Sequence, residues 1–284
     1  MAFHSVDSLL AAAADKPLWQ AVQDDDCRDR GADCAESWNK MSALWSAMQC
    51  AVRDYDGTRR SPSGLVGGCG AQIEQSDRSL CGPFIQQVIA TALKTGECNA
   101  CMGRIVAAPT AGASGVMPAV LLPVRDKFSL SDEAMIQALY VAAGFGQVIA
   151  TRASISGAEG GCQAEIGSAS AMAAAALVHL QGGTPVQMAH ACAMALKNLL
   201  GLVCDPVAGL VEVPCVKRNV AGAMNALACA EMALAGIPSA IPCDEVIDAM
   251  RAVGDSLPSA LRETGLGGLA ATPTGRRVAE QFLN

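Results

Sequence analysis

The fold is decided by one long stretch that contains no charged residue, Ile166-Gly-Ser-Ala-Ser-Ala-Met-Ala-Ala-Ala-Ala-Leu-Val-His-Leu-Gln-Gly-Gly-Thr-Pro-Val-Gln-Met-Ala-His-Ala-Cys-Ala-Met-Ala-Leu196. Gly182, Gly183 and Pro185 interrupt it, because glycine favours turns and proline cannot continue a helix. A membrane span needs about 20 consecutive apolar residues. We therefore predict two buried core helices, over residues 163–181 and 185–199, rather than a membrane segment.

The whole composition agrees with a helical protein. The chain has 284 residues, of which 51% are hydrophobic and only 4% are aromatic. Small side chains let helices approach one another closely, and no segment shows the alternation of a strand or a βαβ unit. The sequence therefore predicts an all-α, compact multi-helix bundle that forms a single domain over residues 1–284, with Gly- and Pro-rich loops carrying the functional residues.

Further helices are expected on both sides of the core stretch. Spacings of three and four residues from Trp38 to Tyr55 indicate one face of a helix, with Asp33 as its N-cap and Asp56-Gly57 as its end. Other helices are expected over residues 4–14, 83–94 ended by Gly96, 130–150 with Ser131 as N-cap, 220–235 and 244–253. The charged run 24–30 is expected to be a solvated turn.

The bulk charge and the amino terminus exclude several classes of protein. The formal net charge of −7 argues against a nucleic-acid partner, because phosphate binding needs a basic surface. The first residues have neither the basic nor the apolar segment of a signal peptide. A disulfide framework is therefore not expected, and most of the 13 cysteines are predicted to be reduced and buried in a cytoplasmic protein.

Three of the cysteines differ from the others in their surroundings. Cys162 lies in Gly-Gly-Cys-Gln-Ala-Glu-Ile-Gly-Ser-Ala, Cys204 in Gly-Leu-Val-Cys-Asp-Pro-Val-Ala-Gly, and Cys215 in Val-Pro-Cys-Val-Lys-Arg-Asn. A cysteine in a Gly- or Pro-rich turn is better placed to bind a metal than a cysteine that packs inside a helix. Thiolates bind both zinc and iron–sulfur clusters, so these three cysteines alone leave the metal open.

The remaining cysteines give weaker signals. Cys50, Cys192 and Cys229 lie in helical, apolar surroundings that favour packing, and Cys243 precedes a predicted helix. Cys98-Asn-Ala-Cys101 is a single C-x-x-C without a second pair, which is a weak metal signal.

Two loops carry possible binding functions. Ala108-Pro-Thr-Ala-Gly-Ala-Ser-Gly115 places small residues and two hydroxyls before an apolar run, and backbone N–H groups at such a turn suit an anion, in particular a carboxylate. A tight turn between helices is the alternative. Residues 59–70 hold many glycines and form either a surface loop or a flexible segment over the site.

These motifs resemble the α subunit of iron–sulfur-dependent L-serine dehydratase. The resemblance rests on the cysteine motifs, on the run 108–115 and on Thr-Gly-Leu-Gly-Gly-Leu-Ala-Ala-Thr-Pro-Thr-Gly at residues 264–275, and it covers nearly the whole chain. It implies a 4Fe–4S cluster held by Cys162, Cys204 and Cys215, with L-serine as substrate. The residues expected to bind substrate are Thr110, Gly112, Ser114, Gly115, Asn99, Asn198 and Asn219.

Three protein ligands would leave one iron of such a cluster free to act as a Lewis acid on the substrate hydroxyl. Single-chain members of the family close this position with a cysteine near the C-terminus. Here no cysteine follows Cys243. The fourth ligand is therefore expected to be water, the substrate or a residue of a partner.

The base that removes the Cα proton is less well defined. The three histidines are His4 near the terminus and His179 and His190 in apolar helical stretches, where core roles are favoured. Lys197 is the candidate within the chain, and a separate β subunit is the alternative source. A related lyase acting on cysteine and a non-catalytic, metal-holding subunit are the competing functions.

Overall fold

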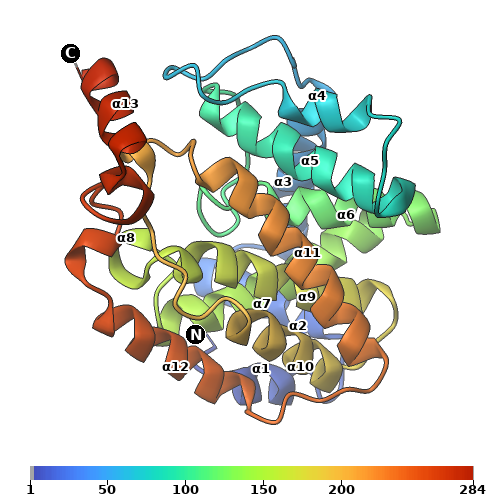
Figure 1. Ribbon diagram of the computed structural model, residues 1–284. Coiled ribbons are helices and arrows are strands. Elements are labelled where there is room, and N and C mark those ends of the chain that lie inside the picture. Colours follow the sequence, from blue (N-terminus) through green and yellow to red (C-terminus); the bar gives the residue numbers. More distant parts are fainter. Residues whose placement is uncertain (1–2, 284) are drawn as a thin grey trace.

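The computed structural model describes residues 3–283 and is built of helices (Figure 1). Within this range no β-strand is formed, and a single isolated bridge pairs Cys204 with Arg262. The predicted all-α fold is thus confirmed. The α-helices are α1 Val6–Ala12, α2 Leu18–Arg30, α3 Cys34–Arg53, α4 Cys69–Glu74, α5 Gly82–Ala100, α6 Val116–Phe128, α7 Asp132–Arg152, α8 Gly157–Gly160, α9 Ser168–Leu180, α10 Pro185–Lys197, α11 Cys215–Leu234, α12 Cys243–Ser256 and α13 Pro273–Leu283.

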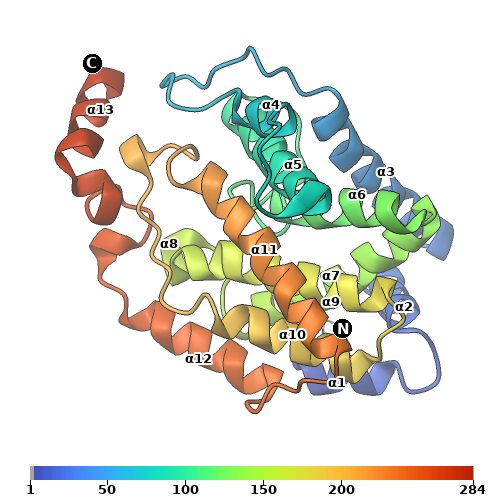
Figure 2. The same cartoon turned by 45° about the vertical axis from the view of Figure 1, so that its right-hand side comes forward.

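Helix α9 lies at the centre of the bundle. Every residue from Ser168 to Val178 is buried, and α6, α7, α10 and α11 pack around the helix (Figures 1 and 2). Its run of alanines lets these neighbours approach closely. Helix α11 comes so near that a Cβ on Gly222 would lie 3.0 Å from a methyl group of Ile166. The stretch that lacks charged residues therefore forms the core, as the sequence predicts.

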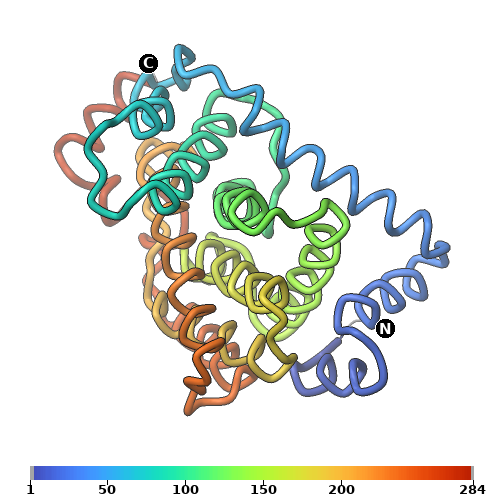
Figure 3. Tube along the Cα trace, turned by 90° about the vertical axis from the view of Figure 1, so that its right-hand side faces the viewer, coloured from blue at the N-terminus to red at the C-terminus, as the bar shows by residue number. Residues whose placement is uncertain are grey.

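The amino-terminal helices cover one side of this core. Helix α3 runs along the outer edge of the molecule (Figure 3), and it packs with α2 against α7. Trp38 stacks on Tyr140 with ring centroids 6.1 Å apart, and the Tyr140 hydroxyl lies 2.7 Å from the Ser37 hydroxyl. Aromatic rings thus fill part of the interface between α3 and α7.

Several helix boundaries follow the sequence signals. Asp33 caps α3 by accepting a hydrogen bond from the Glu36 backbone N–H, and Ser131 caps α7 through the Ala134 N–H, as predicted. Helix α5, however, continues through Gly96 to Ala100. A Cβ at Gly96 would lie 3.2 Å from Val216, so this glycine serves close packing against α11 and does not end the helix.

Two other boundaries differ from prediction. The charged run 24–30 forms the last turns of α2, because Ala21 and Val22 on the same helix are buried against the core. Helix α11 begins at Cys215, five residues before the expected start at Val220, so that Cys215 lies on a helix and not in a loop.

One described helix, α7, is long and apolar enough to cross a membrane by length and composition. In this protein 67% of the most apolar 18-residue part of α7 is buried in the interior. Such burial is typical of the core helix of a globular bundle.

Candidate active site

The three cysteines singled out by the sequence are brought together at one end of α9 and α11. Cys162 precedes a single π-helical turn, Gln163–Gly167, that leads into α9. Cys204 lies in the extended segment between α10 and α11, and Cys215 is the first residue of α11. All three are buried, with exposed fractions of 2%, 3% and 9% respectively. Elements far apart in the chain thus converge on one thiol-rich site.

The thiols of this site influence one another. Burial raises the pKa of Cys162 to about 11 and that of Cys215 to about 12, and it raises the pKa of Cys204 further. The charge of Cys162 adds to the rise at both Cys204 and Cys215. Because the thiolate is the form that binds metals, a bound positive charge must offset this cost.

The carboxyl-terminal segment fixes the position of Cys204. The Cys204 N–H donates to the Leu261 carbonyl at 2.9 Å, and the Cys204 carbonyl accepts from the Glu263 N–H at 2.8 Å. The next residue, Asp205, accepts a hydrogen bond from the Leu269 N–H at 2.8 Å. The segment from Leu261 to Leu269 therefore positions the cysteine although it carries none itself.

Arg218 brings a positive charge close to two of these thiols, Cys162 and Cys215. Its guanidinium donates to the Val203 carbonyl at 2.7 Å and to the Asp205 carboxylate at 2.8 Å. Its charge lowers the pKa of Cys162 and, to a smaller extent, that of Cys215, although burial dominates at both. Arg218 thus joins the Cys204 segment to α11 while it faces the Cys162 thiol.

A carboxylate that sequence reasoning missed lies among the thiols. Glu165 Oε2 is 3.8 Å from Cys204 Sγ, and its charge raises the pKa of all three cysteines. Burial is the main cause that raises the pKa of Glu165 itself. The sequence held two signals: Glu165 is the last charge before the uncharged core stretch, and it stands three residues after Cys162. The π-helical turn, a feature common at functional sites, was not foreseen.

The loop 108–115 is fastened beside this carboxylate by two asparagines. Asn219 accepts a hydrogen bond from the Gly115 N–H at 2.8 Å and donates to the Gly112 carbonyl at 2.8 Å. Asn99 donates to the Ala111 carbonyl at 3.1 Å. Both asparagines therefore reach the predicted substrate loop, but they hold its backbone. The Gly115 N–H is already used in this way.

Two hydroxyl groups of the same loop lack partners. Within the described residues, Thr110 Oγ1 and Ser114 Oγ are buried and make no hydrogen bond of regular geometry. Thr110 lies near enough to Glu165 to oppose the rise in its pKa. Buried polar groups are nearly always satisfied, so these two hydroxyls point to a missing ligand.

Lys197 and Asn198 take part in a different set of contacts. The Lys197 ammonium donates to Ser239 Oγ at 2.9 Å, and Asn198 donates to Asn225 Oδ1 at 2.7 Å and to Cys229 Sγ at 3.4 Å. None of these contacts reaches the three cysteines. The catalytic role of Lys197 and the substrate-binding role of Asn198 stay predictions.

The glycine-rich segment 59–70 is attached next to the site. The Ser61 hydroxyl donates to Glu212 Oε2 at 2.6 Å, and the Ser63 hydroxyl contacts the same oxygen. Glu97 accepts from the backbone N–H of Cys69 at 2.8 Å. The buried carboxylates of Glu212 and Glu97 thus anchor the two ends of the segment, and Glu212 lies on the loop that leads to Cys215.

The three thiols do not form a binding site for a single metal ion. Among residues 3–283, no group of three or more His, Cys, Asp or Glu converges closely enough to bind one metal ion. A structural zinc would need its sulfur ligands about 2.3 Å from a single point. The three buried thiols are the kind of ligand that an iron–sulfur cluster would use.

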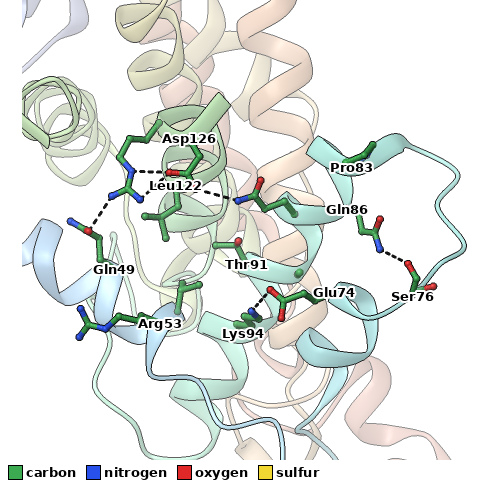
Figure 4. A pocket seen from close by; sticks show the side chains of 14 residues that line it. Gln49, Arg53, Glu74, Ser76, Pro83, Gln86, Thr91, Lys94, Leu122 and Asp126 are labelled. Carbon is green, nitrogen blue, oxygen red and sulfur yellow. Dashed lines mark hydrogen bonds and ion pairs between the residues drawn. The ribbon is translucent and has the colours of Figure 1, made fainter. Parts of the chain in front are cut away.

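A pocket lies between α3, α5 and α6, away from the three cysteines (Figure 4). Its volume is about 560 Å³. Its charged side chains pair with one another, since Lys94 meets Glu74 at 2.7 Å and Arg125 meets Asp126 at 2.9 Å. It contains none of the predicted site residues.

The fold and the site together define an all-helical protein with three buried cysteines beside the loop 108–115. The chain belongs to the serine dehydratase alpha chain family, whose model matches residues 13–270. The chain is 57% identical over 249 residues to the probable L-serine dehydratase, alpha chain, of Bacillus subtilis, covering 87% of this chain and 83% of that protein. It is 61% identical over 197 residues to the corresponding protein of Latilactobacillus sakei, covering 69% and 94%.

Longer relatives match as well. The chain is 44% identical over 192 residues to L-serine dehydratase of Helicobacter pylori, which covers 66% of this chain but only 42% of that protein. The matched region is therefore less than half the length of the Helicobacter pylori protein, and the name of that protein does not specify an alpha or beta chain.

The raised pKa values predict slow alkylation of the site cysteines in the metal-free chain. At pH 8 only about one in a thousand Cys162 side chains is a thiolate if the pKa is about 11. Iodoacetamide followed by peptide mass spectrometry should therefore modify the exposed Cys34 and Cys81 first. The rate at Cys162 should rise about tenfold per pH unit up to about pH 11; a rate that is constant between pH 7 and 9 would contradict this electrostatic description.

Proposed function

We propose that this chain is the α subunit of a pyridoxal-independent L-serine dehydratase, which converts L-serine to pyruvate and ammonia. The proposal includes a 4Fe–4S cluster held by Cys162, Cys204 and Cys215. The observation that carries it is the convergence of these three buried thiols beside a loop with two unpartnered hydroxyls. The names of the relatives support the substrate.

The chemistry of the proposed reaction explains why these features belong together. Loss of the Cα proton and of the β-hydroxyl removes water from serine and leaves 2-aminoacrylate, which tautomerises and is hydrolysed to pyruvate and ammonia. Hydroxide is a poor leaving group, and a bound cluster with a free coordination position supplies the Lewis acidity for its departure.

The chain's own residues supply binding and orientation. Thr110 and Ser114 have free hydroxyls for the substrate carboxylate, and Asn219 keeps their loop in place. Arg218 holds the Cys204 segment against α11 and stabilises negative charge at Cys162. These residues thus fix the substrate relative to the thiols.

The proton acceptor is proposed to come from a partner chain. The relatives from Bacillus subtilis and Latilactobacillus sakei are named as alpha chains, which supports a separate β subunit. Lys197 donates its hydrogen bond to Ser239 and makes none with the three cysteines or with loop 108–115. A cytoplasmic location is part of the proposal, because all 13 cysteines are free and reducing compartments keep thiols in that state.

The ligand assignment is tested by single substitutions. Cys162→Ala, Cys204→Ala and Cys215→Ala should each abolish the visible absorbance and the iron content of the anaerobically purified chain, because each removes one of the thiolates. Cys50→Ala should retain both, since Cys50 lies on the outer helix α3. Full iron content in Cys204→Ala would refute the assignment.

The role of the hydroxyls is tested by kinetics. Thr110→Val combined with Ser114→Ala should raise KM for L-serine about ten- to a hundredfold, the loss expected for charge-assisted hydrogen bonds. Thr151→Val provides a control, because the Thr151 hydroxyl bonds only to its own helix, at the Gln147 carbonyl. An unchanged KM in the double variant would place the substrate carboxylate elsewhere.

The function itself is tested by an anaerobic pyruvate assay. The chain with a reconstituted cluster should produce pyruvate from L-serine only after mixing with its β partner, because the proposed base lies on that partner. If the chain alone formed pyruvate as fast as the mixture with the β partner, the base would have to belong to this chain. Cysteine as the preferred substrate would favour a related lyase.

A further inference from the structure

Glu165 is a half-buried carboxylate that lies beside the Cys204 thiol. It forms no ion pair with any of residues 3–283. Its described neighbours are the Cys204 thiol at 3.8 Å and the Thr110 hydroxyl. Arg218, the cation that acts on this site, already donates to the Val203 carbonyl and the Asp205 carboxylate. A half-buried carboxylate without an ion pair is stabilised in its charged form when a cation binds next to it.

Two glycines border this carboxylate. A Cβ at Gly157 would lie 2.7 Å from Glu165 Oε2 and 2.9 Å from Cys204 Sγ, so no side chain fits there. A Cβ at Gly112 would lie 3.5 Å from Glu165 Oε1. Glu165 therefore faces the substrate loop 108–115 on one side and the cysteines on the other, with no bulky side chain at either glycine.

The unpartnered groups around Glu165 are complementary in charge to an amino acid. Thr110 and Ser114 offer hydroxyl donors that suit a carboxylate, and Glu165 offers an anion that suits an ammonium group. Both kinds of group belong to adjoining elements, because Gly112 lies between the two hydroxyl residues and against Glu165. A zwitterion satisfies both sides at once.

We propose that Glu165 binds the α-ammonium group of the amino-acid substrate. This inference rests on the proposed function and adds a specificity residue to it. With the carboxylate at loop 108–115 and the hydroxyl directed to the thiol site, the ammonium contact is the third point of attachment. Three points of attachment distinguish L-serine from D-serine, whereas two points of attachment do not.

The experiment compares two ligands that differ only in the amino group. L-alanine and propanoate have no leaving group, so both bind without reacting. Calorimetric titration of the anaerobic holoenzyme with each ligand should give a dissociation constant for propanoate about ten- to a hundredfold higher than for L-alanine. In Glu165→Gln, which keeps the size of the side chain, this ratio should fall to about one. Glu165→Asp should give an intermediate ratio.

Glu159→Gln is the matched control. Glu159 is an exposed residue six positions earlier in the chain, and its carboxylate accepts a hydrogen bond from the Ser154 hydroxyl at 2.6 Å. The same loss of charge there should leave the ratio unchanged. The ratio of KM values for the two serine enantiomers should likewise fall in Glu165→Gln and not in Glu159→Gln.

Two results would overturn the ammonium site while leaving the proposed function intact. One is an unchanged ratio in Glu165→Gln in an enzyme that still forms pyruvate. The other is loss of the iron and of the visible spectrum in Glu165→Gln and Glu165→Asp, which would make Glu165 a cluster ligand. A wild-type holoenzyme that binds no amino acid and forms no pyruvate would reject the proposed function as well.

Discussion

Burial of α9 on every side is the constraint on which the rest of this protein depends. A helix surrounded by four others can be packed without voids only if its side chains are small, and Ser168 to Val178 is mostly alanine and serine. The neighbouring helices accommodate it with glycines of their own, as Gly146 does against Met172 and Gly222 against Ile166. Close packing leaves little freedom at the N-terminal end of α9, which is the end that carries Cys162 and Glu165.

A cluster of groups that can carry negative charge is the second organising feature. Three thiols and one carboxylate lie within electrostatic range of one another, and one arginine faces them. Such a group is stable only as neutral thiols or with added positive charge. The same carboxylate that disfavours thiolates in the metal-free chain would be neutralised by a bound cation or by an ammonium group. If the proposed function holds, metal binding, substrate binding and protonation are coupled in this site.

Local signals in the sequence predicted the elements that depend on local physics. The caps Asp33 and Ser131, the break at Gly182-Gly183 and the uncharged core could all be read from neighbouring residues. Gly96 could not, because its role is set by Val216 on another helix. Glu165 was missed for a similar reason: only the folded chain places it beside Cys204, which lies 39 residues further on. Asn99 and Asn219 were found, but as candidates for substrate contact, whereas the structure uses their side chains to hold a loop.

The hydrogen bonds around the cysteines join residues that are far apart in the sequence, which limits when the site can form during synthesis. The contact between Gly115 and Asn219 spans 104 residues, and that between Asp205 and Leu269 spans 64. Contacts of such separation form late, and a chain leaves the ribosome amino terminus first. The segment that fixes Cys204 is near the carboxyl end. A ligand that requires all three thiols in place would therefore bind only after the chain has been synthesised beyond Leu269.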